Sequence, residues 1–388
     1  MKSNRSPSRR DFIKLAGLGL GALAFETPHF QRLPVTVPQF KVGDYLGRVA
    51  VFPDYFSTAL RSQPNENSTK IRDVGQDEVV LWQREVIGAN VSGRTNTRWV
   101  ETPDGFIYAP TLQPVRYFPN TPITSLPEGK SGFWAEVTVP FVELVLRNSP
   151  IGEGVKYLYQ NHIPIRLYYG QVAWIDKIEQ GPNGIIFYRF NESPQHGYGP
   201  GDVFSGDGTG FHVLTNEDIA PINPNVDPKT KKIVVDATKG YQTLSCFEGK
   251  NEVYFCRVST GFSSTVQDFS TPVGDQTISW KIYSIHMGAN LPASGSGYDT
   301  MAVPWPVFFN TNVGAAIHGV FWHNDFGVRR SHGCVNASPE DAKWIFRWSS
   351  PSISLDQSEI RLQYPNDGSN PSDGKSFSTI VTVNETKA

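Results

Sequence analysis

The sequence has little charge, few cysteines and no long hydrophobic run. Charged residues make up 19% of its 388 residues, against roughly 25% in an average soluble protein. Lysine and arginine (35) nearly balance aspartate and glutamate (37), and the net charge of −2 argues against a nucleic-acid-binding arm. Three cysteines cannot build a disulfide scaffold. We therefore expect a protein that folds around an ordinary hydrophobic core and binds no nucleic acid.

In place of charge, the sequence has 35 glycines, 29 prolines and 12% aromatic residues. Glycine and proline at this frequency, without the period of collagen, divide a chain into short segments joined by turns. This composition predicts a mainly β protein rather than a helical one. At about 150 residues per domain, the length predicts two or three domains.

The first 26 residues have the organisation of a signal peptide. Basic residues up to Lys14 precede the uncharged run Leu15–Phe25, whose eleven residues are about half of the ~20 that a membrane-spanning helix needs. Ala22-Leu23-Ala24 then places small residues where a signal peptidase cleaves. The stretch Ser8–Lys14 (SRRDFIK) resembles the twin-arginine export motif. Residues 1–26 are predicted to direct the protein to the extracytoplasmic space or cell wall, with no stable membrane span in the mature form.

Two small β modules are predicted to follow the leader. Residues 40–116 contain short apolar segments cut by turn residues, a pattern typical of a small barrel of about five strands. Leu60–Pro64, Arg98–Val100 and Gly105–Tyr108 occur in an order that resembles a bacterial SH3-like domain. Residues 130–218 alternate strands and turns in a similar way and predict a second small β module.

Glycine and proline also mark the boundaries further along the chain. Pro182-Asn183-Gly184 predicts a tight turn within the second module. Three prolines in Pro221–Pro228 restrict the backbone to extended and turn conformations, which predicts a linker. The third domain is expected over residues 229–385, with Lys232–Asp236 as its first strand and Thr379–Val383 as its last.

Two of the three cysteines lie on the two strands of a predicted hairpin in this third domain. A turn at Glu248–Asn251 places Cys246 opposite Val253 or Tyr254, not opposite Cys256. We therefore predict two buried thiols rather than a cross-strand disulfide.

One helix is predicted near the end of the third domain. Ser338 is a suitable N-cap, Pro339 suits the first helical position, and Glu340 and Asp341 suit the first turn. The apolar residues that follow at helical spacing are Ala342, Trp344, Ile345 and Trp348.

Cys334 differs from the other cysteines because it lies in a polar, glycine-containing segment. A free thiol has a pKa of about 8.5, so its use as a nucleophile requires a nearby base or a positive field. His318, His323 and His332 all lie within sixteen residues of Cys334. A strand that ends at His318 and a return segment that carries Cys334 could bring imidazole and thiol together. Gly333 would let a substrate carbonyl approach the backbone closely.

The segment Ser331-His332-Gly333-Cys334-Val335-Asn336, preceded by His318 at an interval of twelve residues, resembles the catalytic motif of YkuD-type L,D-transpeptidases. Val258–Gly261, Thr271–Gly274 and Ala316–Gly319 support the resemblance. It covers residues 229–385 and implies a β-sandwich or barrel catalytic domain with a short helix after the cysteine motif. The expected fold class is therefore mainly β, with SH3-like small barrels followed by this domain.

The resemblance also implies a role for each residue of the motif. Cys334 would attack a peptide carbonyl of a peptidoglycan stem, release D-alanine and form a thioester. His318 would accept the thiol proton, and the backbone carbonyl of Gly319 would orient its ring. His332 and Ser331 would order the site, while the N–H groups of Gly333 and Cys334 would bind the oxyanion. An amine of a second stem peptide would then complete the cross-link.

Residues near the motif are candidate substrate contacts. Arginine could pair with stem carboxylates, although a solvated basic loop is the competing interpretation. The apolar candidates could line the cleft or belong to the core. His323 and His286 are expected at the surface or in supporting positions. The candidate substrate contacts are Arg330, Trp322, Met301, Tyr298 and Asn336.

No cofactor and no metal ion are predicted. The potential ligands His318, His323, His332 and Cys334 lack the paired spacing of zinc sites. Three functions remain open: an exported peptidoglycan L,D-transpeptidase, which uses donor and acceptor stem peptides; an L,D-carboxypeptidase or cysteine peptidase with the same Cys–His pair; and a non-catalytic wall-binding protein. The presence of both Cys334 and His318 favours an enzyme.

Overall fold

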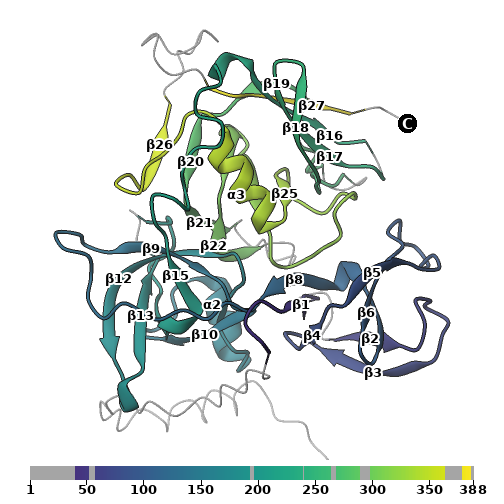
Figure 1. Cartoon of the computed structure of the whole chain (residues 1–388), viewed down its shortest axis with the longest axis horizontal. Helices are drawn as coiled ribbons and strands as arrows, with labels where there is room; N and C mark the ends of the chain where they lie inside the picture. The colour runs from purple at the N-terminus through teal and green to yellow at the C-terminus, as the bar shows by residue number, and fades with distance from the viewer. Residues whose placement is uncertain are drawn as a thin grey trace, which may run out of the picture.

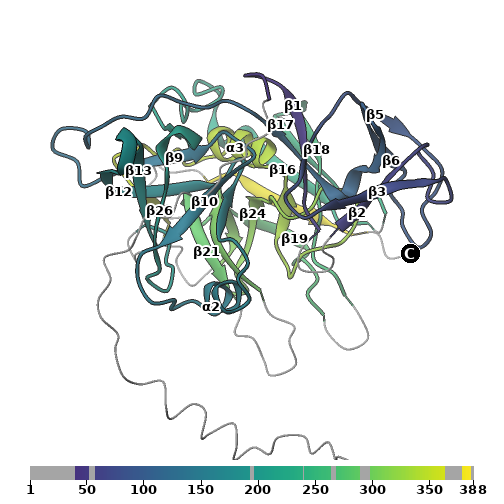
Figure 2. The same cartoon turned by 90° about the horizontal axis from the view of Figure 1, so that it is seen from below.

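A computed structural model describes residues 40–51, 57–192, 196–238, 240–263, 268–288, 298–362 and 378–385. The chain is mainly β, as predicted, and its strands form three groups in space, here called the first, second and third units (Figure 1). The perpendicular view shows the first and second units at opposite ends (Figure 2). The predicted signal peptide lies outside the described residues. Within those residues, no helix is long and apolar enough to cross a membrane.

The first unit consists of a three-stranded sheet in the order β4-β1-β8 and a five-stranded sheet in the order β3-β2-β7-β6-β5. Its core contains Leu60, Val74, Val100 and Ile107. About five strands were predicted, and the described residues of this unit contain eight. Strands such as β3 and β5 lack a continuous buried face, so their pattern gives little signal. The elements are β1 (Tyr45–Val49), β2 (Ser57–Arg61), β3 (Lys70–Gly75), β4 (Val79–Leu81), β5 (Arg84–Ile87), β6 (Arg98–Thr102), β7 (Gly105–Tyr108), η1 (Ala109–Thr111) and β8 (Leu112–Arg116).

The second unit is one seven-stranded sheet in the order β11-β10-β14-β13-β12-β9-β15. The predicted tight turn joins β12 to β13, where Asn183 and Gly184 adopt φ of 61° and 77°. Helix α2 was not predicted. The elements are β9 (Phe133–Val137), β10 (Phe141–Leu146), α2 (Glu153–Gln160), β11 (Arg166–Tyr168), β12 (Val172–Gln180), η2 (Pro182–Gly184), β13 (Ile186–Asn191), β14 (Val203–Asp207), η3 (Gly208–Gly210) and β15 (Phe211–Val213).

The third unit follows the proline-rich linker and has two five-stranded sheets, β18-β17-β16-β27-β19 and β25-β24-β23-β20-β26, with a separate hairpin β21–β22. Helix α3 packs into the core that the two sheets share, through Ala342, Ile345 and Phe346. The elements are η4 (Pro228–Thr230), β16 (Lys231–Asp236), β17 (Thr243–Glu248), β18 (Asn251–Arg257), β19 (Gly274–Thr277), β20 (Trp280–Ile282), β21 (Ser284–Gly288), β22 (Asp299–Pro304), β23 (Val307–Asn310), β24 (Ala315–Gly319), β25 (Val335–Ala337), α3 (Pro339–Trp348), β26 (Glu359–Arg361) and β27 (Ile380–Asn384).

Two local predictions for the third unit are confirmed. In the β17–β18 hairpin, Cys246 pairs with Tyr254 and Leu244 pairs with Cys256, so the two buried cysteines are free thiols. Helix α3 begins as expected, because the Ser338 side chain accepts a hydrogen bond from the N–H of Asp341. Hairpin register and helix capping depend on local sequence, which explains why both could be predicted.

A partly buried histidine, His286, joins the second unit to hairpin β21–β22. His286 Nδ1 lies 2.9 Å from Glu192 Oε1, and its Nε2 lies 2.7 Å from Asp299 Oδ1. Burial alone would lower the pKa of His286, but the hydrogen bonds to Asp299 and Glu192 raise it to about 10. The imidazolium is therefore present at neutral pH. Asp299 also accepts the N–H of Gly154 in α2, which fastens the hairpin to the second unit.

Lys281 closes the C-terminal end of α3. Its side chain is fully buried, and Nζ donates to the carbonyls of Phe346, Ser349 and Pro351 at 2.6, 2.9 and 2.7 Å. Burial lowers the pKa of Lys281 to about 7. The last carbonyls of a helix have no partner within it, so Lys281 supplies the missing donors.

Lys281→Met is expected to lower the free energy of unfolding by about 3 kcal/mol, because buried carbonyls lose their donor. Denaturant unfolding measures the loss. Lys250→Met, at an exposed position in the β17–β18 turn, is the matched control and should change stability by less than about 0.5 kcal/mol. A loss at Lys281 no larger than at Lys250 would contradict the capping role.

Candidate active site

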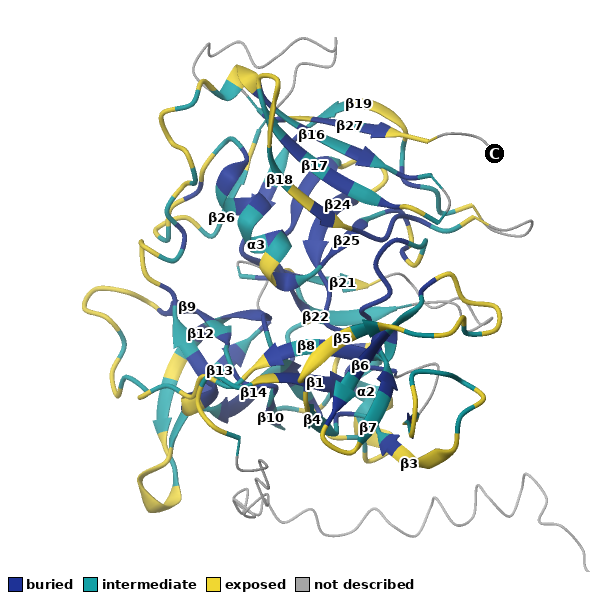
Figure 3. Ribbon diagram, turned by 45° about the vertical axis from the view of Figure 1, so that its right-hand side comes forward, coloured by how far each residue is buried: buried dark blue, intermediate teal, exposed yellow. Residues whose placement is uncertain are grey.

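His318 and Cys334 lie on neighbouring segments at the edge of one sheet. Strands β24 and β25 are parallel, and His318 pairs with Asn336 in their register. Cys334 lies one residue before β25 and packs against the apolar cluster that contains Ala316, which lies two residues before His318 on the same face of β24. Both strands are among the buried elements of Figure 3.

His318 has the hydrogen bond that a general base requires. Its Nδ1 lies 3.0 Å from the carbonyl oxygen of Gly319, and the side chain is buried. Because a carbonyl only accepts, Nδ1 carries the proton and Nε2 keeps a free lone pair. Burial lowers the pKa of His318 to about 4. The imidazole is therefore neutral at pH 7 and can take up a proton at Nε2.

Cys334 is half-buried and packs, like Met287 and Trp322, against a small apolar cluster. Its thiol donates to the carbonyl of Gly314 over 3.6 Å. Burial raises the pKa of Cys334 to about 11, and the backbone N–H of Ala316 opposes this shift in part. At neutral pH the thiol is protonated. The thiol and the imidazole of His318 are therefore both neutral at rest, and the thiol must lose its proton as it attacks.

The turn before β25 holds Cys334 in place. Gly333 adopts a φ of 116°, a conformation that residues with a side chain rarely adopt. The Ser331 hydroxyl donates to the carbonyl of Cys334 and accepts the N–H of Gly333 at 3.2 Å. Across the described residues, no protein hydrogen bond occupies the N–H of Cys334. This N–H is therefore the freer of the two predicted oxyanion donors.

Aromatic rings border the site on the side of His332. The exposed His332 ring lies 5.2 Å from Phe262, 4.7 Å from Phe269 and 5.1 Å from Tyr298, between ring centroids. Burial lowers the pKa of His332. Burial, together with the neighbouring Cys334, raises the pKa of Tyr298. Tyr298 is therefore within electrostatic range of the thiol, and its substrate contact stays a prediction.

His323 is buried and contacts Asn336, which is the supporting position that was one of its two expected places. Its Nδ1 accepts the N–H of Asp325 at 3.2 Å, and its Nε2 lies 3.2 Å from the amide nitrogen of Asn336. Burial, with Arg330 and His318 nearby, lowers the pKa of His323 to about 3. Asn336 was predicted to contact substrate, but its side chain is buried against His323. The aromatic residues next to His323 in the sequence are the signal from which the burial of His323 could be predicted.

The remaining candidates differ in their access to the site. Arg330 is exposed, with Nε 3.9 Å from Asp325 Oδ2. Trp322 is half-buried, and its ring centroid lies 6.1 Å from that of His318. Met301 packs against the core of the second unit. In the part of the chain that the structure describes, no three His, Cys, Asp or Glu side chains come together to hold a metal ion.

The protonation states predict the pH dependence of thiol reactivity. Alkylation of Cys334 by iodoacetamide is expected to accelerate about tenfold per pH unit between about pH 6 and pH 9, because the thiolate fraction grows up to a pKa near 11. Peptide mass spectrometry locates the modified cysteine. A rate that is constant from about pH 5 to pH 8 would instead indicate a resting thiolate–imidazolium pair.

Comparison with known proteins identifies the region that carries this site. Residues 230–358, about a third of the chain, match the family model of the YkuD-type L,D-transpeptidase catalytic domain. This segment contains both His318 and Cys334. No curated protein matches the chain significantly.

Solved structures that resemble part of the chain are also L,D-transpeptidases. The catalytic domain from E. faecium is 18% identical (39% of this chain, 95% of that chain, TM-score 0.27). An enzyme from Mycobacterium smegmatis is 17% identical (48% and 99%, TM-score 0.26). L,D-transpeptidase 1 from Mycobacterium tuberculosis is 18% identical (39% and 61%, TM-score 0.24). These TM-scores are too low to establish a common fold over the whole chain.

Proposed function

We propose that this protein is an exported peptidoglycan L,D-transpeptidase in which Cys334 is the nucleophile and His318 is the general base. The observation that carries the proposal is the β24–β25 register, which pairs His318 with Asn336, two residues after Cys334, within the segment that matches the catalytic-domain family. The tautomer of His318 supports the assignment, since Nδ1 is occupied by Gly319 and Nε2 is free.

Acylation begins when a donor stem peptide places its scissile carbonyl beside Cys334. The thiol turns from the Gly314 carbonyl toward His318 and transfers its proton to Nε2 while Sγ attacks the carbonyl carbon. The N–H of Cys334 donates to the oxyanion, and the N–H of Gly333 joins it when released from Ser331. The C–N bond then breaks and the imidazolium protonates the departing amine. D-alanine is released, and the acyl group remains on Cys334 as a thioester.

Deacylation reverses the proton path. Neutral His318 removes a proton from the amine of an acceptor stem, which attacks the thioester carbonyl. The C–S bond breaks, and the proton returns to the Cys334 sulfur as the new amide forms. The aromatic rings around His332, together with Tyr298 and exposed Arg330, are proposed to contact the stem peptides. Water in place of the amine would give carboxypeptidase activity.

The remaining parts of the chain are proposed to serve export and placement at the wall. Residues 1–26 would be a twin-arginine signal peptide, residues 40–116 an SH3-like barrel, residues 130–218 a second β module and residues 229–385 the catalytic domain. The two-sheet arrangement of β1 to β8 supports the barrel, and β27 extends the third unit beyond the matched segment by pairing with β16.

Incubation of the purified protein with stem tetrapeptides tests the proposed function. Mass spectrometry is expected to detect free D-alanine and a cross-linked peptide dimer. D-alanine with tripeptide but no dimer would assign the protein as an L,D-carboxypeptidase. The absence of both products from a folded protein whose Cys334 reacts with iodoacetamide would contradict the proposal.

A further inference from the structure

The loop after His318 is almost entirely buried although it has no regular secondary structure. Residues 320–326, here called the His323 loop, run from the end of β24 toward the Cys334 turn. Phe321, His323, Asn324 and Asp325 are each less than 9% exposed. Connecting loops usually lie at the surface, because a buried loop carries backbone groups that need partners. The backbone groups of the His323 loop therefore need partners from elsewhere in the chain.

Most of the partners come from the first unit, more than 200 residues away in sequence. Arg98 on β6 donates through Nη2 to the carbonyl of Asn324 at 2.8 Å. The Asn324 N–H and side-chain amide donate to the carbonyls of Pro110 and Ala109 at 3.2 and 3.3 Å. Arg48 on β1 donates through Nη2 to the carbonyl of Phe321 at 2.5 Å. The first unit thus contacts both halves of the His323 loop.

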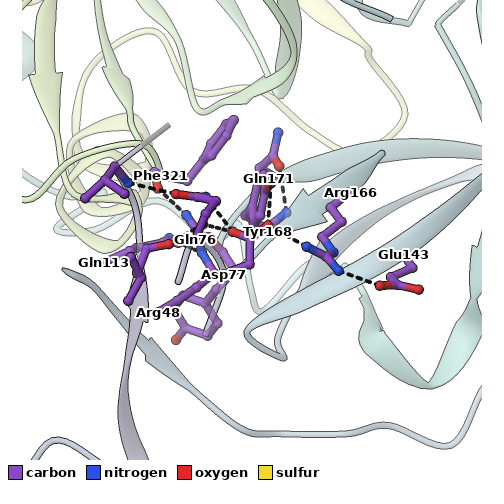
Figure 4. A network of polar contacts seen from close by, with 12 residues as sticks. Arg48, Gln76, Asp77, Gln113, Glu143, Arg166, Tyr168, Gln171 and Phe321 are labelled. Carbon is purple, nitrogen blue, oxygen red and sulfur yellow. Dashed lines mark hydrogen bonds and ion pairs between the residues drawn. The ribbon is translucent and has the colours of Figure 1, made fainter. Parts of the chain in front are cut away.

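Arg48 is itself held in a single orientation by a buried network (Figure 4). Its Nε donates to Gln113 at 2.9 Å, and its Nη1 pairs with Asp77 Oδ1 at 2.6 Å. The other oxygen of Asp77 pairs with Arg166 of the second unit at 2.6 Å. The Arg48 guanidinium also lies over the Tyr168 ring, 3.9 Å from its centroid. With its remaining donors engaged, Arg48 directs Nη2 at the loop carbonyl.

The opposite side of the His323 loop faces the candidate active site. His323 contacts Asn336, which pairs with His318 between the two strands. Trp322 packs with Cys334 in one apolar cluster. The loop therefore contributes to the burial of the thiol and the imidazole, and burial is the main cause of both of their pKa shifts.

We propose that Arg48 and Arg98 are positioning residues through which the first unit clamps the His323 loop against the His318–Cys334 site. The first unit is thus part of the structure that sets the reactivity of Cys334. The expected effect of the clamp on turnover rests on the proposed function, whereas its expected effect on the reactivity of the Cys334 thiol does not.

Arg98→Met tests the clamp, and Arg84→Met is its matched control. Arg84 lies on neighbouring β5 and forms an ion pair with Glu101, with its side chain 71% exposed. When the loop loosens, the thiol is better hydrated and its pKa falls toward the ordinary value. Alkylation of Cys334 by iodoacetamide near pH 8 is then expected to accelerate at least about threefold in Arg98→Met. The control should stay within about 1.5-fold of the wild type, and Arg98→Lys should recover part of the wild-type rate.

A second variant covers the case in which Arg98→Met does not fold. Asn324→Ala removes the amide contact to Ala109 from the other side of the interface and is expected to accelerate alkylation in the same direction. Where the wild type is active on tetrapeptides, both variants should lower kcat by about tenfold with KM nearly unchanged, because the loop supports the reacting groups. A wild-type alkylation rate in the folded variants would overturn the proposal. Inactivity of the wild type would overturn only the proposed function.

Discussion

Cys334→Ala is expected to reduce D-alanine release from stem tetrapeptides by about 10⁴-fold or more. Removing a catalytic nucleophile leaves only what substrate binding and oxyanion stabilisation contribute. The alanine side chain fits the space of the half-buried thiol, so the fold should be retained. Product release is measured by mass spectrometry or by a coupled D-amino-acid assay, with stability checked by thermal unfolding.

The same substitution at the other cysteines provides the control. Cys246 and Cys256 lie in the core of the third unit, and burial raises the pKa of both thiols. Cys246→Ala and Cys256→Ala are expected to lower stability modestly and to leave turnover near the wild-type value. Full activity in Cys334→Ala would exclude the proposed nucleophile.

His318→Gln is expected to lower kcat by about 10² to 10⁴-fold at pH 7, because glutamine cannot accept the thiol proton. Its side-chain amide can still donate to the Gly319 carbonyl, so the packing around β24 should be preserved. The defect should shrink at high pH, where hydroxide removes the thiol proton without the base. The measurement is a pH–rate profile of both proteins.

A histidine away from the site is the control for His318→Gln. His212 on β15 pairs with Asp218 and is partly exposed. His212→Gln should leave both kcat and its pH dependence unchanged. If His318→Gln lowered kcat equally at all pH values, His318 would have a structural role and would not be the general base.

The central residues of the site could be predicted because their signal is local. His318 and the segment from Ser331 to Asn336 form a short motif, and the α3 cap at Ser338 follows it directly. The same holds for the register that separates Cys246 from Cys256. In each case the residues that interact lie within about twenty positions of one another, so spacing alone carries the information.

The environment of the site could not be predicted for the opposite reason. The clamp on the His323 loop joins Arg48 and Arg98 to backbone carbonyls of Phe321 and Asn324, more than 200 residues away. A carbonyl acceptor has no sequence signature, because every residue carries one. The burial of Asn336, predicted as a substrate contact, likewise depends on a partner, His323, that only the tertiary structure brings near.

The thioester on Cys334 is tested most directly by the mass of the protein quenched in acid after mixing with a stem tetrapeptide. We expect an added mass equal to the tetrapeptide minus D-alanine, located on the peptide that contains Cys334 and removable by hydroxylamine as a thioester is. An adduct on another residue, or D-alanine release in Cys334→Ala at the wild-type rate, would contradict it.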